Sequence, residues 1–250
     1  MNLNYFAGST YASIARFLKS RSLFPLSRKL PFGSDWLYDV QRFSGTREAG
    51  YIVDAGANVG QTAKLIIQYF PRASVYCFEP VSSTCSQLTE NMRKSRNVEC
   101  IAKALGERPA KQTIQLHHFS EINTLVKNDV RTHDLTGETE EIDIVTLDGF
   151  CATRKIPHLD VLKLDVQGWE LNVLLGCSEL IRAKKIRFVY SEVAFNSSES
   201  DMQHFSELDT FMESSGFMLS GFYEPFRFGD RREFLGFCNA LYVNASFVGS

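Results

Sequence analysis

A glycine-containing turn at residues 54–60 is the first arrangement in this chain that could do chemistry. Its sequence, Asp-Ala-Gly-Ala-Asn-Val-Gly, directly follows an apolar run and opens a helical pattern. Gly56 permits a sharp turn and close approach of a ligand to the backbone, and Gly60 permits close contact between helix and strand. The start of the helix supplies unpaired N–H groups that suit a carboxylate or phosphate. We expect Ala57 and Asn58 to line the ligand with these glycines.

A second acid follows the next apolar run of the chain. Glu79 comes directly after residues 74–78 and precedes Pro80. In a doubly wound sheet this carboxylate would lie beside the glycine turn, at the edge where ligands bind, and it could accept both hydroxyls of a ribose. The predicted cofactor-binding residues also include Pro80, Ala104, which follows the run at residues 97–103, and Asp165, which follows the run at residues 161–164.

The turn could bind either of two nucleotide cofactors, and its composition favours one of them. A dinucleotide-binding enzyme would show Gly-x-Gly-x-x-Gly, whose second glycine lets a pyrophosphate approach the backbone. Here Asn58 occupies the interior of the motif. Asp54 would repel a pyrophosphate but could accept a hydrogen bond from the ammonium of a methionine moiety. The pattern therefore predicts S-adenosylmethionine rather than a nicotinamide dinucleotide.

Three further carboxylates converge on the same predicted edge. Asp165 ends the apolar run 161–164, Glu192 follows the run 188–191, and Glu170 lies in the first turn of the helix after Asp165. A positioned base promotes reaction of a hydroxyl by taking its proton. We predict Asp165 as the carboxylate nearest the acceptor, with Glu170 or Glu192 orienting the substrate. The histidines do not have the spacing of metal ligands. The sequence leaves open a divalent cation bound by Asp165 and Glu192, because hard oxygen ligands suit Mg²⁺.

Apolar runs alternate with helical patterns from residue 51 onward. Runs that are apolar on both faces predict a mainly parallel α/β sheet covered by helices on both sides. The expected strands span residues 51–55, 74–78, 97–103, 161–165, 186–193, 217–222 and 236–243, and the expected helices 61–69, 82–94, 169–175 and 202–214. A polar insertion at about 106–145 would add short strands at 113–117 and 142–147. We predict one doubly wound domain over residues 49–250.

The first 48 residues form a predicted helical extension of basic character. No acid precedes Asp35, whereas five bases do: Arg16, Lys19, Arg21, Arg28 and Lys29. We expect a basic helix packed over the edge of the domain. A transit peptide or a helix lying on a membrane surface are the alternative interpretations.

Composition points to a globular cytoplasmic protein. Hydrophobic residues make up 44% of the chain and the formal net charge is -2, so no strong positive field favours nucleic acid. No apolar run approaches the ~20 residues that span a bilayer. The 6 cysteines include no Cys-x-x-Cys pair, which favours reduced thiols over disulfides or a zinc site. The sequence leaves open whether the chain forms a homo-oligomer.

The separate motifs together resemble one known family. The similarity to FkbM-type methyltransferases rests on the glycine turn, on Phe78-Glu79-Pro80 and on Lys163-Leu-Asp165-Val-Gln-Gly168-Trp-Glu170, and it extends over roughly residues 36–243. The family implies a class I methyltransferase fold, with a seven-stranded sheet whose last strand is antiparallel, and O-methylation of polyketide, sugar or related metabolite hydroxyls. Many relatives carry Glu where this chain has Gln167, which removes one carboxylate from the presumed substrate side.

The resemblance also implies residues around an acceptor. The segment 122–125 is similar to the part of the family that lies over the site, so Asn123 and Thr124 could belong to a lid. Trp169, Phe195 and Tyr223 follow expected strand ends and could line the acceptor pocket, although ordinary packing explains them equally well.

The prediction is an S-adenosylmethionine-dependent methyltransferase that acts on a hydroxyl of a small metabolite or a sugar. A nicotinamide-dependent oxidoreductase is the enzymatic alternative, disfavoured by the missing middle glycine and by the absence of an obvious hydride-transfer set. A methyltransferase-like binding module without turnover is the other alternative. A nucleic-acid methyltransferase is disfavoured because the chain has no Asn/Asp-Pro-Pro-Tyr/Phe motif for a flipped base.

Overall fold

The computed structural model describes residues 30–45, 49–117, 135–196 and 202–247. The chain divides into two compact units, Met1–Arg47 and Glu48–Ser250. In the first unit, α2 (Trp36–Ser44) begins at Asp35, whose side chain accepts a hydrogen bond from the Tyr38 N–H, and it ends at the left-handed Gly45. The five basic residues that precede Asp35 lie outside the described residues.

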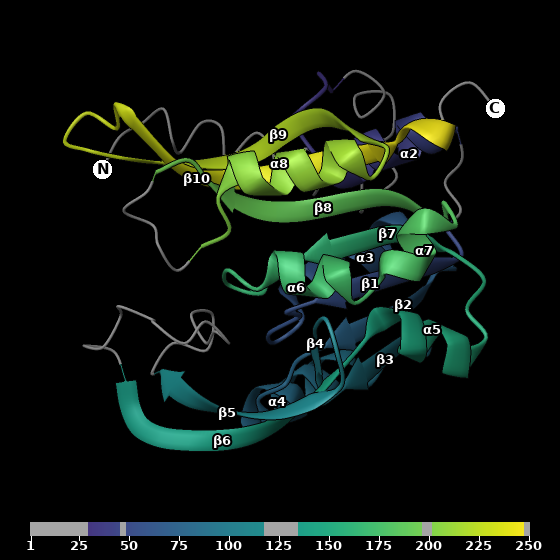
Figure 1. Cartoon of the computed structure of the whole chain (residues 1–250), viewed down its shortest axis with the longest axis vertical. Coiled ribbons are helices and arrows are strands. Elements are labelled where there is room, and N and C mark those ends of the chain that lie inside the picture. Colours follow the sequence, from purple (N-terminus) through teal and green to yellow (C-terminus); the bar gives the residue numbers. More distant parts are fainter. Residues whose placement is uncertain (1–29, 46–48, 118–134, 197–201, 248–250) are drawn as a thin grey trace. The chain divides into compact units, whose positions relative to one another are not determined.

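A seven-stranded sheet forms the second unit, in the order β3-β2-β1-β7-β8-β10-β9 (Figure 1). Its strands are β1 (Tyr51–Ala55), β2 (Ser74–Phe78), β3 (Val98–Ile101), β7 (Leu159–Leu164), β8 (Ile186–Ala194), β9 (Phe217–Phe228) and β10 (Phe234–Asn244). Neighbours from β3 to β8 pair in parallel, and β10 pairs antiparallel with both β8 and β9. The strand order reverses between β1 and β7, where doubly wound sheets bind ligands. The predicted fold is therefore confirmed.

Helices cover both faces of this sheet. They are α3 (Gln61–Tyr69), α4 (Ser82–Met92), α5 (Leu147–Arg154), α6 (Glu170–Leu175), α7 (Ser178–Arg182) and α8 (Phe205–Ser214). Figure 1 shows α5 to α8 on the near face and α3 on the far face. The sequence did not predict α5 or α7. The first of these begins at Thr146, inside the range expected to be a strand, and the second is only 5 residues long.

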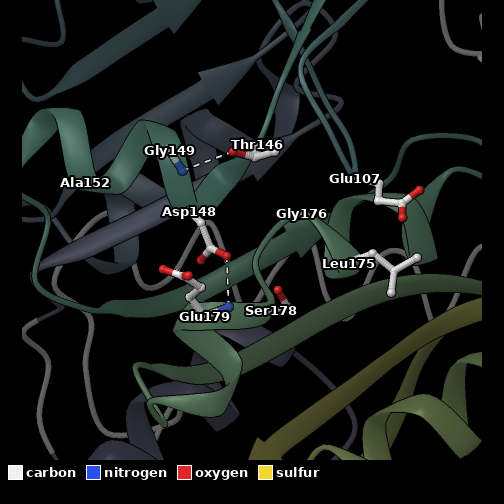
Figure 2. Close-up of a pocket in the computed structure, with 9 residues that line it drawn as sticks. All are labelled: Glu107, Thr146, Asp148, Gly149, Ala152, Leu175, Gly176, Ser178 and Glu179. Carbon is white, nitrogen blue, oxygen red and sulfur yellow. Dashed lines mark hydrogen bonds between the residues drawn. The ribbon is translucent and has the colours of Figure 1, made fainter.

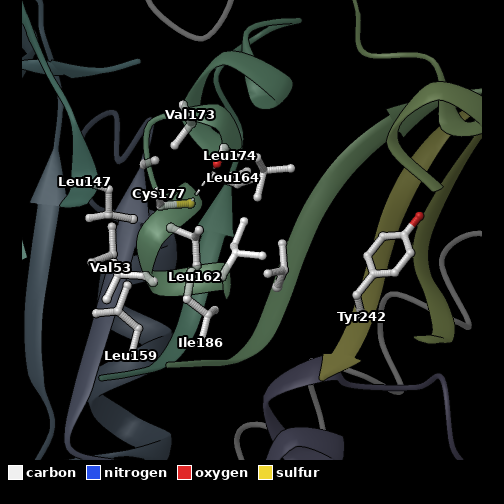
Figure 3. Close-up of a cluster of buried hydrophobic side chains, with 14 of the residues drawn as sticks. Val53, Leu147, Leu159, Leu162, Leu164, Val173, Leu174, Cys177, Ile186 and Tyr242 are labelled. Atoms are coloured by element: carbon white, nitrogen blue, oxygen red, sulfur yellow. Dashed lines mark hydrogen bonds between the residues drawn. The ribbon is translucent and has the colours of Figure 1, made fainter. Parts of the chain in front are cut away.

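The near face of the sheet holds the main hydrophobic core (Figure 3). Alternate residues of the central strands, such as Val53, Leu162 and Val189, are fully buried there against α5 to α8. Burial of each such side chain stabilises the fold by roughly 1.5–3 kcal/mol. Because successive side chains of a strand point to opposite faces, the intervening Asp54 and Lys163 face the other side of the sheet. The core thus fixes the strands that carry the polar residues.

The insertion forms a second, three-stranded sheet in the order β4-β6-β5. Its strands are β4 (Ala104–Leu105), β5 (Ala110–His117) and β6 (Leu135–Val145), so the two predicted strands are longer than expected and β4 was not predicted. Glu140 of β6 accepts hydrogen bonds from the backbone and the hydroxyl of Ser82, which joins this sheet to the start of α4. The predicted lid residues, Asn123 and Thr124, lie outside the described residues.

The prediction that β9 ends at Phe222 is wrong. The strand continues to Phe228, and therefore Tyr223 lies inside it rather than after its end. Pro225 explains the error, because a proline normally argues against a strand. Since β9 is the edge strand of the sheet, the N–H that proline lacks is not needed there.

We expect Gly176→Ala to destabilise the second unit. A Cβ at Gly176 would lie 2.0 Å from the backbone oxygen of Gly106, so the end of α6 and the insertion would have to move apart. Overpacking of this kind should lower the free energy of unfolding by about 1–3 kcal/mol, as measured by urea denaturation. Gly221→Ala is the matched control, because its Cβ would meet only the Tyr223 side chain, at 3.4 Å. Equal losses in both variants would contradict the close approach.

Candidate active site

The turn between β1 and α3 has glycine where its geometry requires it. Gly56 has a φ of +73°, and a Cβ there would lie 1.8 Å from the backbone oxygen of Asp165. The N–H groups of Gly56 and Ala57 both donate to the Phe78 carbonyl at 3.0 Å. Gly60, with a φ of +91°, begins α3 without any side-chain cap hydrogen bond. The turn therefore lies directly against the carboxyl ends of both β2 and β7.

Glu79 lies beside this turn, as the sequence predicted. Its Oε2 accepts the Asn58 N–H at 3.1 Å and its Oε1 accepts the Val81 N–H at 3.1 Å. A carboxylate has about four lone-pair positions, so two remain for further donors. Burial raises the pKa of Glu79 to about 7, although the two backbone N–H groups oppose this shift.

The other predicted cofactor-binding residues gather near the same loop. Ala57 is 3% exposed, and Pro80 is half-buried directly after Glu79. Ala104, in β4, packs in a small apolar cluster that includes Val81. The structure thus brings residues of the glycine turn, of the Glu79 loop and of the insertion into one neighbourhood.

Asp54 is fully buried, and its side chain faces a lysine. The Lys163 ammonium lies 3.0 Å from Asp54 Oδ1. Burial raises the pKa of Asp54, and the positive charge of Lys163 opposes that shift. No role was predicted for Lys163 from the sequence. Its one available indication was a single charge within the apolar run of residues 161–164.

The two rim acids Asp165 and Glu192 are brought together by Gln167. The Gln167 Nε2 donates to Asp165 Oδ1 at 3.1 Å and to Glu192 Oε2 at 3.2 Å. Gln167 and Gly168 are both left-handed, with φ of 54° and 87°, so the chain turns sharply here. Burial raises the pKa of Glu192 to about 8, with Asp165 and Glu170 adding to the shift while Lys163 and Gln167 oppose it.

Glu170 lies beneath this turn rather than on the rim. Glu170 is the first residue of α6 and is only 1% exposed. Its Oε1 accepts a hydrogen bond from the Val166 N–H at 3.0 Å. Burial raises the pKa of Glu170 to about 7, against hydrogen bonds from the backbone of the turn. The structure therefore places Glu170 where it holds the turn that carries Gln167.

The three predicted aromatic residues pack against other parts of the fold. Trp169 packs against the main core and the small cluster of the insertion. Phe195 contacts Phe205 and Phe222, with ring centroids 5.3 Å and 5.7 Å apart. Tyr223 is 3% exposed and its ring lies 5.9 Å from that of Tyr190.

A separate hollow of about 350 Å³ lies between α5, α6 and α7 (Figure 2). None of the predicted site residues lines it. Asp148 is one of the residues that line the hollow. Its carboxylate accepts hydrogen bonds from the backbone N–H groups of Glu179 and Leu180, at 2.9 Å and 3.0 Å, and so caps α7. This hollow is therefore distinct from the site at the carboxyl edge of the sheet.

We expect the stability of the protein to depend on pH through Glu192. The pKa of this group is 4.5 when unperturbed and about 8 in the folded chain. A raised folded pKa means that protonation stabilises the folded state, and that this stability is lost as pH rises from 4.5 through about 8. The free energy of unfolding of the unaltered protein should therefore fall relative to that of Glu192→Gln across this range.

Urea denaturation at the two ends of the range measures this difference. Glu141→Gln is the matched control, since the Glu141 side chain is 61% exposed on β6. A difference between the unaltered protein and Glu192→Gln that stays constant with pH would contradict the burial of this carboxyl group.

Comparison with known proteins places the chain in a family. A model described as the methyltransferase FkbM domain matches residues 54–219. The 2-O-methyltransferase NoeI of Sinorhizobium fredii is 26% identical over 159 residues, which cover 56% of this chain and 62% of NoeI. Methyltransferase 1 of Beauveria bassiana is 26% identical over 164 residues, which cover 58% of this chain and 64% of that protein. The match thus spans less than two thirds of either relative.

A solved structure, the precorrin-6y C5,15-methyltransferase of Geobacter metallireducens, has a TM-score of 0.45 at 9% identity and covers 86% of this chain and 90% of its own. The domain match spans more than half of the sequence, from the glycine turn through the rim acids into β9. The chain belongs to the FkbM methyltransferase family.

Proposed function

We propose that this protein is an S-adenosylmethionine-dependent methyltransferase that transfers a methyl group to a hydroxyl oxygen of a small metabolite or a sugar. One observation carries the proposal: the glycine turn lies between two acids at the carboxyl edge of the sheet. Asn58 donates to Glu79 on one side, and Gly56 lies against the backbone of Asp165 on the other. The family and the printed name of NoeI, a 2-O-methyltransferase, support oxygen as the methylated atom.

The residues of the turn fit the methyl donor. Glu79 keeps acceptor positions for the two hydroxyls of a ribose, and the uncapped start of α3 offers N–H groups to a carboxylate. Gly56 keeps the backbone free of a Cβ at the closest approach of the two strands. The donor supplies an activated methyl group on a sulfonium, so the protein needs mainly to align the acceptor with it. Good alignment alone can contribute roughly 7–11 kcal/mol.

Asp165 and Glu192, the two acids at the rim, have different roles toward the acceptor. Asp165, whose side chain is 39% exposed, takes the proton of the hydroxyl as the oxygen bonds to the methyl carbon. The bond from that carbon to the sulfonium sulfur breaks at the same time, and S-adenosylhomocysteine is the leaving group. Glu192, with a pKa of about 8, carries a proton at neutral pH and orients the acceptor by donating a hydrogen bond. Glu170 is a positioning residue, because it is buried under the turn that holds Gln167.

A divalent cation between Asp165 and Glu192 does not fit this arrangement. The Gln167 amide donates to one oxygen of each acid, and a hydrogen-bond donor between them opposes a positive ion. The described residues contain no group of three or more His, Cys, Asp or Glu able to hold a metal. The reaction is therefore proposed without a step through a cation.

We also propose a cytoplasmic location. All 6 cysteines are free thiols, and five of them are buried in the fold. Such thiols persist where the surroundings are reducing. Among the helices of the described residues, none is both long and apolar enough to span a bilayer.

The donor is tested by thermal unfolding in the presence of candidate ligands. We expect S-adenosylhomocysteine, but not NADH, to raise the melting temperature, because a ligand that binds only the folded state stabilises it. Mass spectrometry should then detect the gain of one methyl group on a hydroxylated acceptor in a panel of sugars and small metabolites. Stabilisation by NADH would favour the oxidoreductase alternative. Stabilisation by S-adenosylhomocysteine without any methylated product would favour the binding module.

The proton acceptor is tested by Asp165→Asn. We expect kcat to fall by about 10²–10⁴-fold, because an amide cannot take the proton of the hydroxyl. Binding of S-adenosylhomocysteine, measured by calorimetry, should change only a few-fold. Asp143→Asn, on the exposed surface of β6, is the matched control and should keep full activity. Unchanged turnover in Asp165→Asn would remove Asp165 from the mechanism, and loss of the ligand would reassign it to donor binding.

A further inference from the structure

Lys163 is buried at the point where the two halves of the proposed site meet. Its side chain is 5% exposed, and its ammonium lies 3.0 Å from Asp54 Oδ1 and 3.3 Å from Asp165 Oδ2. The same ammonium donates to the Gly56 carbonyl at 3.1 Å. One group therefore contacts an acid of β1, the glycine turn and the acid at the rim.

The pairing of strands brings these groups to one face of the sheet. Asp54 and Lys163 are register partners in the parallel pair of β1 and β7. Side chains alternate along a strand, so Asp165, two positions after Lys163, begins on the same face. The backbone of Asp165 is also hydrogen-bonded to the end of β1, because its N–H donates to the Ala55 carbonyl at 3.1 Å.

Electrostatics keeps the Lys163 ammonium charged. Burial alone would lower the pKa of Lys163, but the negative charges of Asp165 and Asp54 raise it by more. An ammonium has three N–H donors, and here three oxygens lie within reach of them. No donor is left for a substrate, so Lys163 has the contacts of a residue that positions other groups rather than one that reacts.

We propose that Lys163 is the positioning residue that aligns the proton acceptor with the methyl donor. This inference rests on the proposed function. By binding the Gly56 carbonyl, the ammonium fixes the peptide that the donor approaches. By binding one oxygen of Asp165, it leaves the carboxylate with a defined orientation, which Gln167 supports from the other oxygen.

The consequence is a specific kinetic signature. Without the ammonium, Asp165 keeps Gln167 as a partner but loses the contact that directs it toward the glycine turn. A misplacement of about 1 Å in an active site can cost about 10²-fold in rate. Of the groups proposed to bind the donor, Gly56 contacts Lys163 through its carbonyl, whereas Glu79 and the start of α3 form no hydrogen bond with it in the described structure. The effect should therefore fall mainly on the chemical step.

The test compares the unaltered protein with Lys163→Met and with the double variant Asp54→Asn, Lys163→Met. The double variant removes the acid that would otherwise be buried without a counter-charge, so it keeps the test valid if the single variant does not fold. Lys111→Met is the matched control, because Lys111 is also paired, at 2.7 Å from Glu141, but its side chain is 66% exposed.

In the double variant we expect kcat to fall by about 10²-fold, while KM for S-adenosylmethionine and the affinity for S-adenosylhomocysteine change only a few-fold. Lys163→Arg, which keeps the positive charge, should recover part of kcat. Lys111→Met should match the unaltered protein. Unchanged kcat in the double variant, or a loss confined to donor affinity, would overturn the inference.

A measurement without turnover gives an independent readout. Amide hydrogen exchange in the ligand-free protein should become faster in residues 55–58 and 165–168 of the double variant, and not in Lys111→Met. Unchanged exchange there would overturn the inference even if the protein is active. Absence of methyl transfer by the unaltered protein would instead overturn the proposed function, and the exchange comparison would still decide whether Lys163 holds the two turns.

Discussion

A positive charge buried between two acids sets the geometry of this site. The Lys163 ammonium lies within 3.3 Å of Asp54 and Asp165, and the fold has removed Lys163 and Asp54 almost completely from water. A buried charge is costly unless it is paired, so neither of these two can be lost without leaving the other unfavourable. Because the partners belong to β1 and β7, the same pairing joins the strands on either side of the switch point. The ligand-binding edge is thus held by charge as well as by backbone hydrogen bonds.

The apolar face of the sheet makes that pairing possible. Val53 and Leu162 face α5 to α8 and are fully buried, so a shift of register would bring polar side chains into the core. The same register aligns Asp54 with Lys163 on the opposite face. Packing on one side of the strands therefore specifies an electrostatic contact on the other. This coupling explains why a lysine can occupy an interior strand without weakening the definition of the fold.

The parts of the site that depend on local sequence patterns could be predicted from the sequence. Glycines that follow a strand, and acids at strand ends, can each be recognised within a single short segment. In the structure the glycine turn and Glu79 are in contact, because the Asn58 N–H donates to Glu79. The contact of Asp54 with Lys163 depends on register between strands far apart in the chain, so only the isolated charge in an apolar run pointed to it. Short elements were missed for a related reason: α7 and β4 have 5 and 2 residues, too few to show a period. The family and the doubly wound, mainly parallel sheet were predictable because they rest on several long patterns at once.

Gln167 shows how one departure from a family pattern can be read physically. An amide can donate to two carboxylates at once, and it does so here to Asp165 and Glu192. A glutamate in its place would add a third negative charge and offer no N–H, so the two acids would repel with nothing between them. Burial and the nearby charges of Asp165 and Glu170 raise the pKa of Glu192 to about 8, and the hydrogen bond from the amide partly opposes that shift. Asp165 lies 3.3 Å from the Lys163 ammonium, and its side chain is 39% exposed at the rim. Burial of Glu192 and the contact of Asp165 with Lys163 thus give two chemically similar acids different surroundings, while Gln167 joins them.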